Sequence, residues 1–294
     1  MVMSWVLFSI LATLFFAITN VVDKYLLTKW FKKPVIPLLI FGIVSLIASG
    51  IVYLFNGFAP LSPLHIILSF VSGIFSIFGA FLYFKAVQLD EISRIATLFY
   101  LMPLFVLILA TIFLNEIFTL PNYIGILLLI SGAILISLKR FKLSLGLAFW
   151  LIILADLNWA GSLVIMKYLL NFADYWTIFS YTRIGYIFAL VPMFLVNFRD
   201  FFSVIRKNSK AVSVMSLNQT LGVVADLFLT IAVSIGYVTL VNALSSVQPF
   251  FVLLLAVVLS TFYPKILKEE IGRSTVMLKL LAIILMFIGA LLIV

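Results

Sequence analysis

The octapeptide Pro103–Ala110 reads Pro-Leu-Phe-Val-Leu-Ile-Leu-Ala, and it returns as Pro249–Ala256, which reads Pro-Phe-Phe-Val-Leu-Leu-Leu-Ala. Where the two copies differ, one large apolar side chain replaces another. A phrase that recurs at this distance predicts that the chain contains two copies of one unit.

Two shorter phrases repeat in the same order. Lys24–Leu27 returns as Lys167–Leu170, and Gly132–Ile136 returns in similar form as Gly289–Ile293. The offsets of the three phrases are 143, 146 and 157 residues, so small insertions shift the register. The phrases therefore predict a tandem duplication that spans the whole chain.

The composition is that of an integral membrane protein. Hydrophobic residues make up 65% of the chain and charged residues 10%, against about 45–50% and 25% in soluble domains. The absence of cysteine excludes disulfides and thiolate metal sites, and the single histidine, His65, cannot form a histidine metal site. We expect no metal, no cofactor and no nucleic acid partner. The net charge of +9 is better explained by membrane orientation.

Ten apolar stretches are long enough to cross a hydrocarbon core of about 30 Å as helices. The weakest break between them is predicted at Ser234–Gly236, between the eighth and ninth. The predicted spans are residues 4–27, 35–55, 65–88, 93–114, 121–138, 145–170, 176–198, 212–233, 237–261 and 274–294.

The basic residues predict how these spans are oriented. Seventeen of the 19 lysines and arginines lie at one side of a ten-span arrangement, all except Lys167 and Arg183. The positive-inside rule makes that side cytoplasmic and places both termini on the non-cytoplasmic side of the cell membrane. Because five spans per half is an odd number, the halves 1–142 and 143–294 are predicted to form two inverted five-helix repeats, an all-α fold typical of transporters.

Several short motifs resemble the drug/metabolite transporter superfamily in its EamA-type, ten-helix form. That pattern has an alanine late in the third helix, a proline within the fourth, a glutamate at its end and glycines in the fifth. The matching residues are Ala86, Ala96, Pro103, Glu116, Gly125 and Gly132, then Ala232, Pro249, Glu269 or Glu270, and Gly289. The resemblance implies a secondary carrier for small organic metabolites that works by alternating access, often as an exporter, by proton coupling or exchange.

Asp156 is a candidate substrate-binding residue, because an ionisable group inside a bilayer costs at least about 2.5–3.5 kcal/mol. It lies about eleven residues into its span, with Asn158 and Trp159 close behind. Asp156 and Trp159 share a helical face at i, i+3, and a carboxylate beside an indole could hold an amine. The alternative is a structural ion pair.

Asp226 is a second candidate, and with Asp156 it is a possible proton-coupling residue. It continues a stripe of Gln219 and Gly222 along one face of its span. A small and polar helix face inside a membrane faces protein or a water-filled cavity. The alternative is a protonated structural aspartate. For Arg183 we favour a structural ion pair over anion binding.

Further polar residues could line the same cavity or could equally form hydrogen bonds between helices. These are Asn20 in the first span, Tyr100 before Pro103, and Asn242 and Gln248 before Pro249. Because proline inside a helix frees a carbonyl one turn earlier, Pro103 and Pro249 are predicted hinges, with static kinks as the alternative.

Three classes of function are compatible with these features. The favoured one is a secondary active transporter for a small-molecule solute, embedded in lipid, with protons as a possible coupling ion. The second is a non-transporting scaffold or receptor subunit, and the third is an intramembrane enzyme, which would have only carboxylates for catalysis. A monomer is expected, because the joined repeats already supply the two-fold unit.

Overall fold

The computed structural model describes residues 2–31, 33–89, 101–137, 146–248, 250–252, 254–255 and 273–293, and no strand occurs within these ranges. Its helices are α1 (Val2–Lys29), α2 (Val35–Asn56), α3 (Pro63–Leu89), α5 (Met102–Leu114), α6 (Leu120–Ser137), α7 (Leu147–Leu169), α8 (Tyr175–Lys207), α9 (Ser209–Ile235), α10 (Val238–Ser245) and α12 (Arg273–Ile293).

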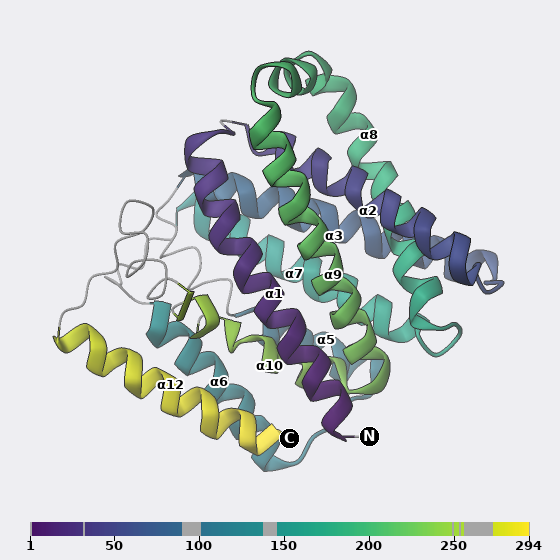
Figure 1. Cartoon of the computed structure of the whole chain (residues 1–294). Helices are drawn as coiled ribbons and strands as arrows, with labels where there is room; N and C mark the ends of the chain where they lie inside the picture. The colour runs from purple at the N-terminus through teal and green to yellow at the C-terminus, as the bar shows by residue number, and fades with distance from the viewer. Residues whose placement is uncertain are drawn as a thin grey trace.

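Six of the helices are long and apolar enough to cross a membrane, namely α1, α2, α3, α7, α8 and α9. Four shorter apolar helices occupy residues 102–114, 120–135, 238–252 and 280–293. Figure 1 shows the long helices gathered in one bundle, with the start of α1 and the end of α12 at one end of it. The connection between α8 and α9 lies at the opposite end. The break predicted at Ser234–Gly236 is present, because α9 ends at Ile235 and Gly236 follows it.

The helices pack in a regular set of pairs. α3 packs on α7, α1 on α9, and α6 on α12, with further contacts of α8 to both α2 and α3. Small residues allow these close approaches. A Cβ added at Gly125 would lie 2.8 Å from the carbonyl oxygen of Gly289, and one added at Gly73 would lie 2.3 Å from that of Thr182.

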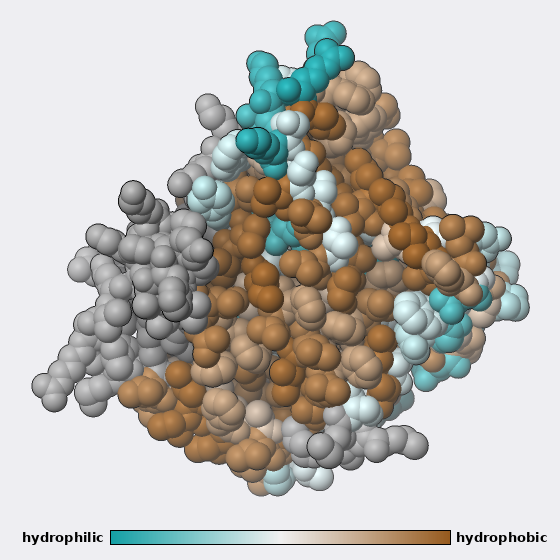
Figure 2. Space-filling model, viewed as in Figure 1, coloured by the Kyte–Doolittle hydropathy of each residue, from teal (hydrophilic) through white to brown (hydrophobic). Residues whose placement is uncertain are grey.

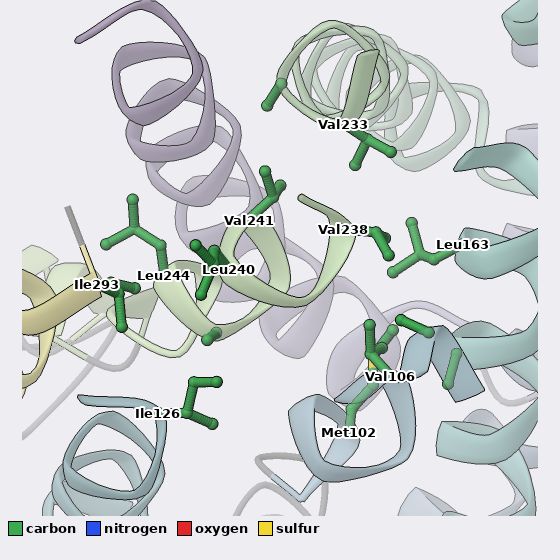
Figure 3. Close-up of a cluster of buried hydrophobic side chains, with 14 of the residues drawn as sticks. Met102, Val106, Ile126, Leu163, Val233, Val238, Leu240, Val241, Leu244 and Ile293 are labelled. Carbon is green, nitrogen blue, oxygen red and sulfur yellow. The ribbon is translucent and has the colours of Figure 1, made fainter. Parts of the chain in front are cut away.

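The short helix α10 lies inside the largest hydrophobic cluster. Its residues Val238, Val241 and Ala243 are fully buried, among side chains from α5, α6, α7, α9 and α12 (Figure 3). Because every residue of α10 except Ser245 is buried, the helix is stable only when it is surrounded by other helices.

Helix α8 is longer than a bilayer requires. Its 33 residues span about 50 Å at 1.5 Å per residue, and the backbone departs from helical geometry at Asn197. Arg199, Arg206 and Lys207 follow that kink and are exposed. Figure 2 shows apolar side chains over the middle of the visible face and hydrophilic ones at the end where α8 meets α9, as expected of a helix that leaves the membrane there.

Candidate functional site

The first candidate site is the surroundings of Asp156, where α3 packs against α7. The hydroxyl of Ser72 donates to the Ser162 carbonyl at 3.0 Å, and the hydroxyl of Ser162 donates back to the Ser72 carbonyl at 2.9 Å. A Cβ at Gly79 would meet the carbonyl oxygen of Ala155 at 3.2 Å. The two helices are therefore held together at backbone distance by small residues and hydrogen bonds.

Asp156 lies on α7 beside this contact and is fully buried. Neither of its carboxylate oxygens has a hydrogen-bond partner among the described residues. Trp159, one turn later, donates its indole N–H to the Ser76 carbonyl at 3.1 Å, and its ring lies 5.8 Å from that of Tyr83 at 52°. The structure thus places a bare carboxylate close to two aromatic rings that α3 and α7 hold in position.

Asp23 is a second acidic group that the sequence reasoning missed. Its Oδ1 accepts hydrogen bonds from the side-chain amides of Asn218 at 2.7 Å and Gln219 at 3.1 Å, which joins α1 to α9. The hydroxyl of Tyr83 lies within electrostatic reach of both Asp23 and Asp156. Asp23 could have been noticed in the sequence as a carboxylate within the first predicted span. It was passed over because it lies near the end of that span, beside Lys24.

Asp226 lies in a different environment from Asp156. Its Oδ2 forms an ion pair with the guanidinium of Arg183 at 2.9 Å, which joins α9 to α8. The same guanidinium lies 3.7 Å from the centre of the Phe179 ring. The ion pair expected for Arg183 is therefore present. Gln219 and Asp226 share a face of α9 but bond to different helices, so the structure does not bring them to one ligand position.

The remaining predicted binding residues are dispersed. Asn158 donates to the Leu154 carbonyl of its own helix at 2.7 Å, and Asn20 is exposed. Asn242 is buried, and its carbonyl oxygen has no hydrogen-bond partner among the described residues. Gln248 is also buried. Tyr100 lies outside the described residues.

The predicted hinges lie beside two matching backbone turns. Pro103 lies in the first turn of α5, where proline is compatible with helix geometry. The amide of Leu104 donates to the Leu101 carbonyl at 2.9 Å, and the amide of Phe250 donates to the Val247 carbonyl at 3.0 Å. Pro249 itself lies outside the described residues.

Two charged side chains stabilise the point where α9 ends and α10 begins. The ammonium of Lys167 donates to the carbonyls of Val233 at 2.8 Å and Gly236 at 2.7 Å. The carboxylate of Glu116 accepts from the amides of Val238 at 2.9 Å and Thr239 at 3.2 Å. A cation at a helix C-terminus and an anion at an N-terminus both complement the helix dipole.

Two open hollows occur on the surface of the described residues, and neither is lined by Asp23, Asp156 or Asp226. Both lie along the second half of α8, and each has a volume of about 560 Å³. Phe198 and Arg199 line both of them. The polar cavity that a carrier was expected to form around Asp156 and Asp226 is not among these hollows, and Asp156 is enclosed in this structure.

A solved structure has a fold similar to that of this chain. A solved structure titled "Crystal structure of protein" is similar over 98% of this chain and 96% of its own, with a TM-score of 0.74 and 16% identity. At this identity the likeness extends to the fold alone. No curated protein matches the chain.

The first half of the chain carries the family assignment. Residues 3–138 match the EamA-like transporter family, whose members are membrane transporters. The motif residues Ala86, Pro103 and Glu116 all lie within the matched residues. With its apolar helices, the chain is a multi-pass membrane protein, and its residues 3–138 are similar to the EamA-like transporter family, the EamA type of the drug/metabolite transporter superfamily.

Proposed function

We propose that this protein is a secondary active transporter that moves a small organic metabolite or drug across the cell membrane by alternating access. The direction is export, coupled to protons or to exchange, and the working unit is a monomer. The observation that carries the proposal is Asp156, a fully buried carboxylate without a partner among the described residues. An uncompensated charge inside a membrane protein is costly, and a solute or a proton would compensate it.

The contacts between helices support an inverted repeat. In an inverted repeat, the helices α1, α2, α3, α5 and α6 correspond in order to α7, α8, α9, α10 and α12. The contact of α3 with α7 then becomes the contact of α9 with α1. The contact of α3 with α8 becomes that of α9 with α2, and α5 with α7 becomes α10 with α1. Each of these contacts occurs, so these three contacts keep their counterparts when the two halves are exchanged.

Individual atoms support the same symmetry. Ser72 bonds to the carbonyl of Ser162, and Asn218 bonds to the carbonyl of Thr19 at 3.2 Å. Asn218 follows Ser72 by 146 residues, and Ser162 follows Thr19 by 143, which are offsets of the repeated phrases.

The glycine contacts between α6 and α12 follow the third offset. A Cβ added at Gly125 would meet the carbonyl oxygen of Gly289, and a Cβ added at Gly132 would meet the carbonyl oxygen of Ala282. Shifting Gly125 and Gly132 by 157 residues gives Ala282 and Gly289, so each contact maps onto the other.

The ten-span arrangement is supported by the six long helices and the four shorter apolar ones. It divides the chain into repeats at residues 1–142 and 143–294, with both termini on the non-cytoplasmic side. The start of α1 and the end of α12 lie at one end of the bundle (Figure 1), as an even number of spans requires.

A non-transporting scaffold is the second function to test, because one observation favours it. Asp226 is held by Arg183 in an ion pair, which is how a purely structural acid is expected to behave. If Asp226 is structural, proton coupling falls to Asp156 or Asp23.

The proposed function is tested by a thermal-shift screen of the purified protein against metabolites and drugs, run in parallel on Asp156→Asn and Asp226→Asn. A ligand that binds only the native state raises the melting temperature. We expect a hit that is lost in Asp156→Asn, followed by movement of that compound in proteoliposomes. Hits that survive both substitutions would show that the carboxylates are structural. A protein that moves no solute would support the scaffold.

A further inference from the structure

Four aspartates of the described residues differ in how their charge is compensated. Asp226 faces Arg183, and Asp200 faces Lys33 at the surface. Asp23 accepts two hydrogen bonds from amides, which are neutral donors. Asp156 has neither a cation nor a hydrogen-bond donor within the described ranges. Within the described residues, therefore, no positive charge compensates Asp156.

Aromatic rings lie beside this carboxylate. Trp159 shares its helical face, and its indole is fixed by the bond to Ser76. Tyr83 packs at 5.8 Å from that indole. The faces of aromatic rings attract cations, and the attraction strengthens when water is excluded. A ring pair beside a lone carboxylate suits an organic cation better than it suits a neutral sugar, which needs several donors and acceptors.

The local charge also disfavours an anion. Asp23 and Asp156 both lie within electrostatic reach of the Tyr83 hydroxyl. Lys85, the nearest described cation along α3, is exposed and lies over the Phe81 ring at 4.8 Å. An anionic solute beside Asp156 would meet a carboxylate that no described cation compensates, and like charges at close range are strongly unfavourable.

From these observations we infer that the solute is an organic cation, an amine with an aromatic or other apolar body, whose charged nitrogen pairs with Asp156 beside Trp159 and Tyr83. The inference rests on the proposed transport function and adds the chemical class of the solute. Asp23 keeps its bonds to Asn218 and Gln219. Because Asp156 is enclosed in this structure, the helices around it must separate to admit the solute.

The test uses the full-length protein and four related probes. They are benzylamine, benzyltrimethylammonium, benzyl alcohol and benzoate, which share one ring and differ in charge. Benzyltrimethylammonium cannot lose its charge, so its binding reports on a cation and not on a proton. We expect both cations to raise the melting temperature and the alcohol and benzoate to leave it unchanged. Failure of both cations to bind would overturn the inference.

Two variants locate the binding, and one is a control. Asp156→Asn keeps the size of the side chain and should weaken cation binding by at least about tenfold, because it removes one partner of a buried charge pair. Trp159→Leu should weaken it less, through the lost ring. Asp200→Asn removes a surface carboxylate and should bind as the wild type does. Equal binding by Asp156→Asn and the wild type would contradict the assignment.

Transport in proteoliposomes separates failure of the inference from failure of the proposed function. Cationic, neutral and anionic metabolites are offered together to vesicles that contain the wild-type protein. Movement of a neutral or anionic compound, undiminished in Asp156→Asn, would retain the transporter and overturn the cationic solute. Movement of cations alone, lost in Asp156→Asn, supports both proposals. If no compound moves, the proposed function itself fails.

Discussion

At the scale of single residues, the ion pair of Arg183 with Asp226 can be tested by substitution. Both groups are charged and the guanidinium is buried, so loss of either partner should have a large effect on stability. Asp226→Leu leaves that guanidinium without its partner and should lower the free energy of unfolding by about 3–5 kcal/mol. Arg183→Met should have a comparable effect. The measurement is chemical unfolding of the purified protein in detergent.

The double variant Arg183→Met with Asp226→Leu provides the control. It replaces both charges by apolar groups, a change that is often close to neutral for a buried pair. We expect it to be more stable than either single variant. A double variant as unstable as the sum of the two singles would mean that the pair is not what stabilises this contact between α8 and α9.

The sequence predicted part of these residue-scale features. Asp156 was recognisable from its depth within a span, and an ion pair was expected for Arg183. The partner of Arg183 could not be predicted, because Asp226 lies on another helix and only packing brings the two together. Asp23 was missed for a related reason: its amide partners lie on α9, nearly 200 residues away along the chain.

At the scale of helices, Glu116 stabilises the start of α10. Its two oxygens accept from the first two amides of that helix, which have no partners within the helix. Glu116→Ala should lower the free energy of unfolding by about 0.5–2 kcal/mol, the usual cost of removing an N-terminal cap. Glu116→Gln keeps an acceptor and should cost less. Equal losses in both variants, measured by thermal unfolding, would show that the negative charge matters more than the hydrogen bonds.

The crossing of α6 and α12 depends on two glycines. An added Cβ at Gly125 or Gly289 would lie 2.8 or 2.7 Å from the facing carbonyl oxygen, so alanine forces the helices apart. Gly125→Ala and Gly289→Ala should each cost about 1–3 kcal/mol, as overpacking does. Gly50→Ala is the matched control within α2, because no atom lies within 4 Å of its added Cβ. It should leave the melting temperature unchanged or slightly raised.

The sequence predicted these two elements unequally. Gly289 was marked by a repeated phrase, both Gly125 and Gly289 were marked by the resemblance to the family, and the break at Ser234–Gly236 was predicted from the chain. The use of Glu116 as a cap for α10 was not, since the two lie 122 residues apart along the chain. Local patterns predict where helices end, whereas the partners of their free backbone groups depend on tertiary packing.

At the scale of the whole molecule, the composition predicted a membrane-embedded helical bundle, and the structure and the family agree. The repeated phrases carry information that composition lacks. Their offsets of 143, 146 and 157 residues also relate contacts between the two halves, such as the bond of Ser72 to Ser162 and that of Asn218 to Thr19. The length of α8 could not be predicted in the same way. The sequence predicted a span of 176–198, but α8 continues to Lys207 beyond its kink at Asn197. Charged residues end an apolar stretch without ending the helix.

The predicted orientation can be tested directly, because the chain contains no cysteine and single cysteines can be added without background. Ser62 precedes α3 and Ser209 begins α9, and both are exposed. The predicted spans 65–88 to 176–198 lie between them and are odd in number, so the two positions should lie on opposite sides. A membrane-impermeant maleimide should label Ser62→Cys in intact cells and Ser209→Cys only after permeabilisation, while the unmodified protein takes no label. Labelling of both from one side would contradict the ten-span arrangement, whereas the reverse pattern would keep the number of spans and overturn the predicted orientation.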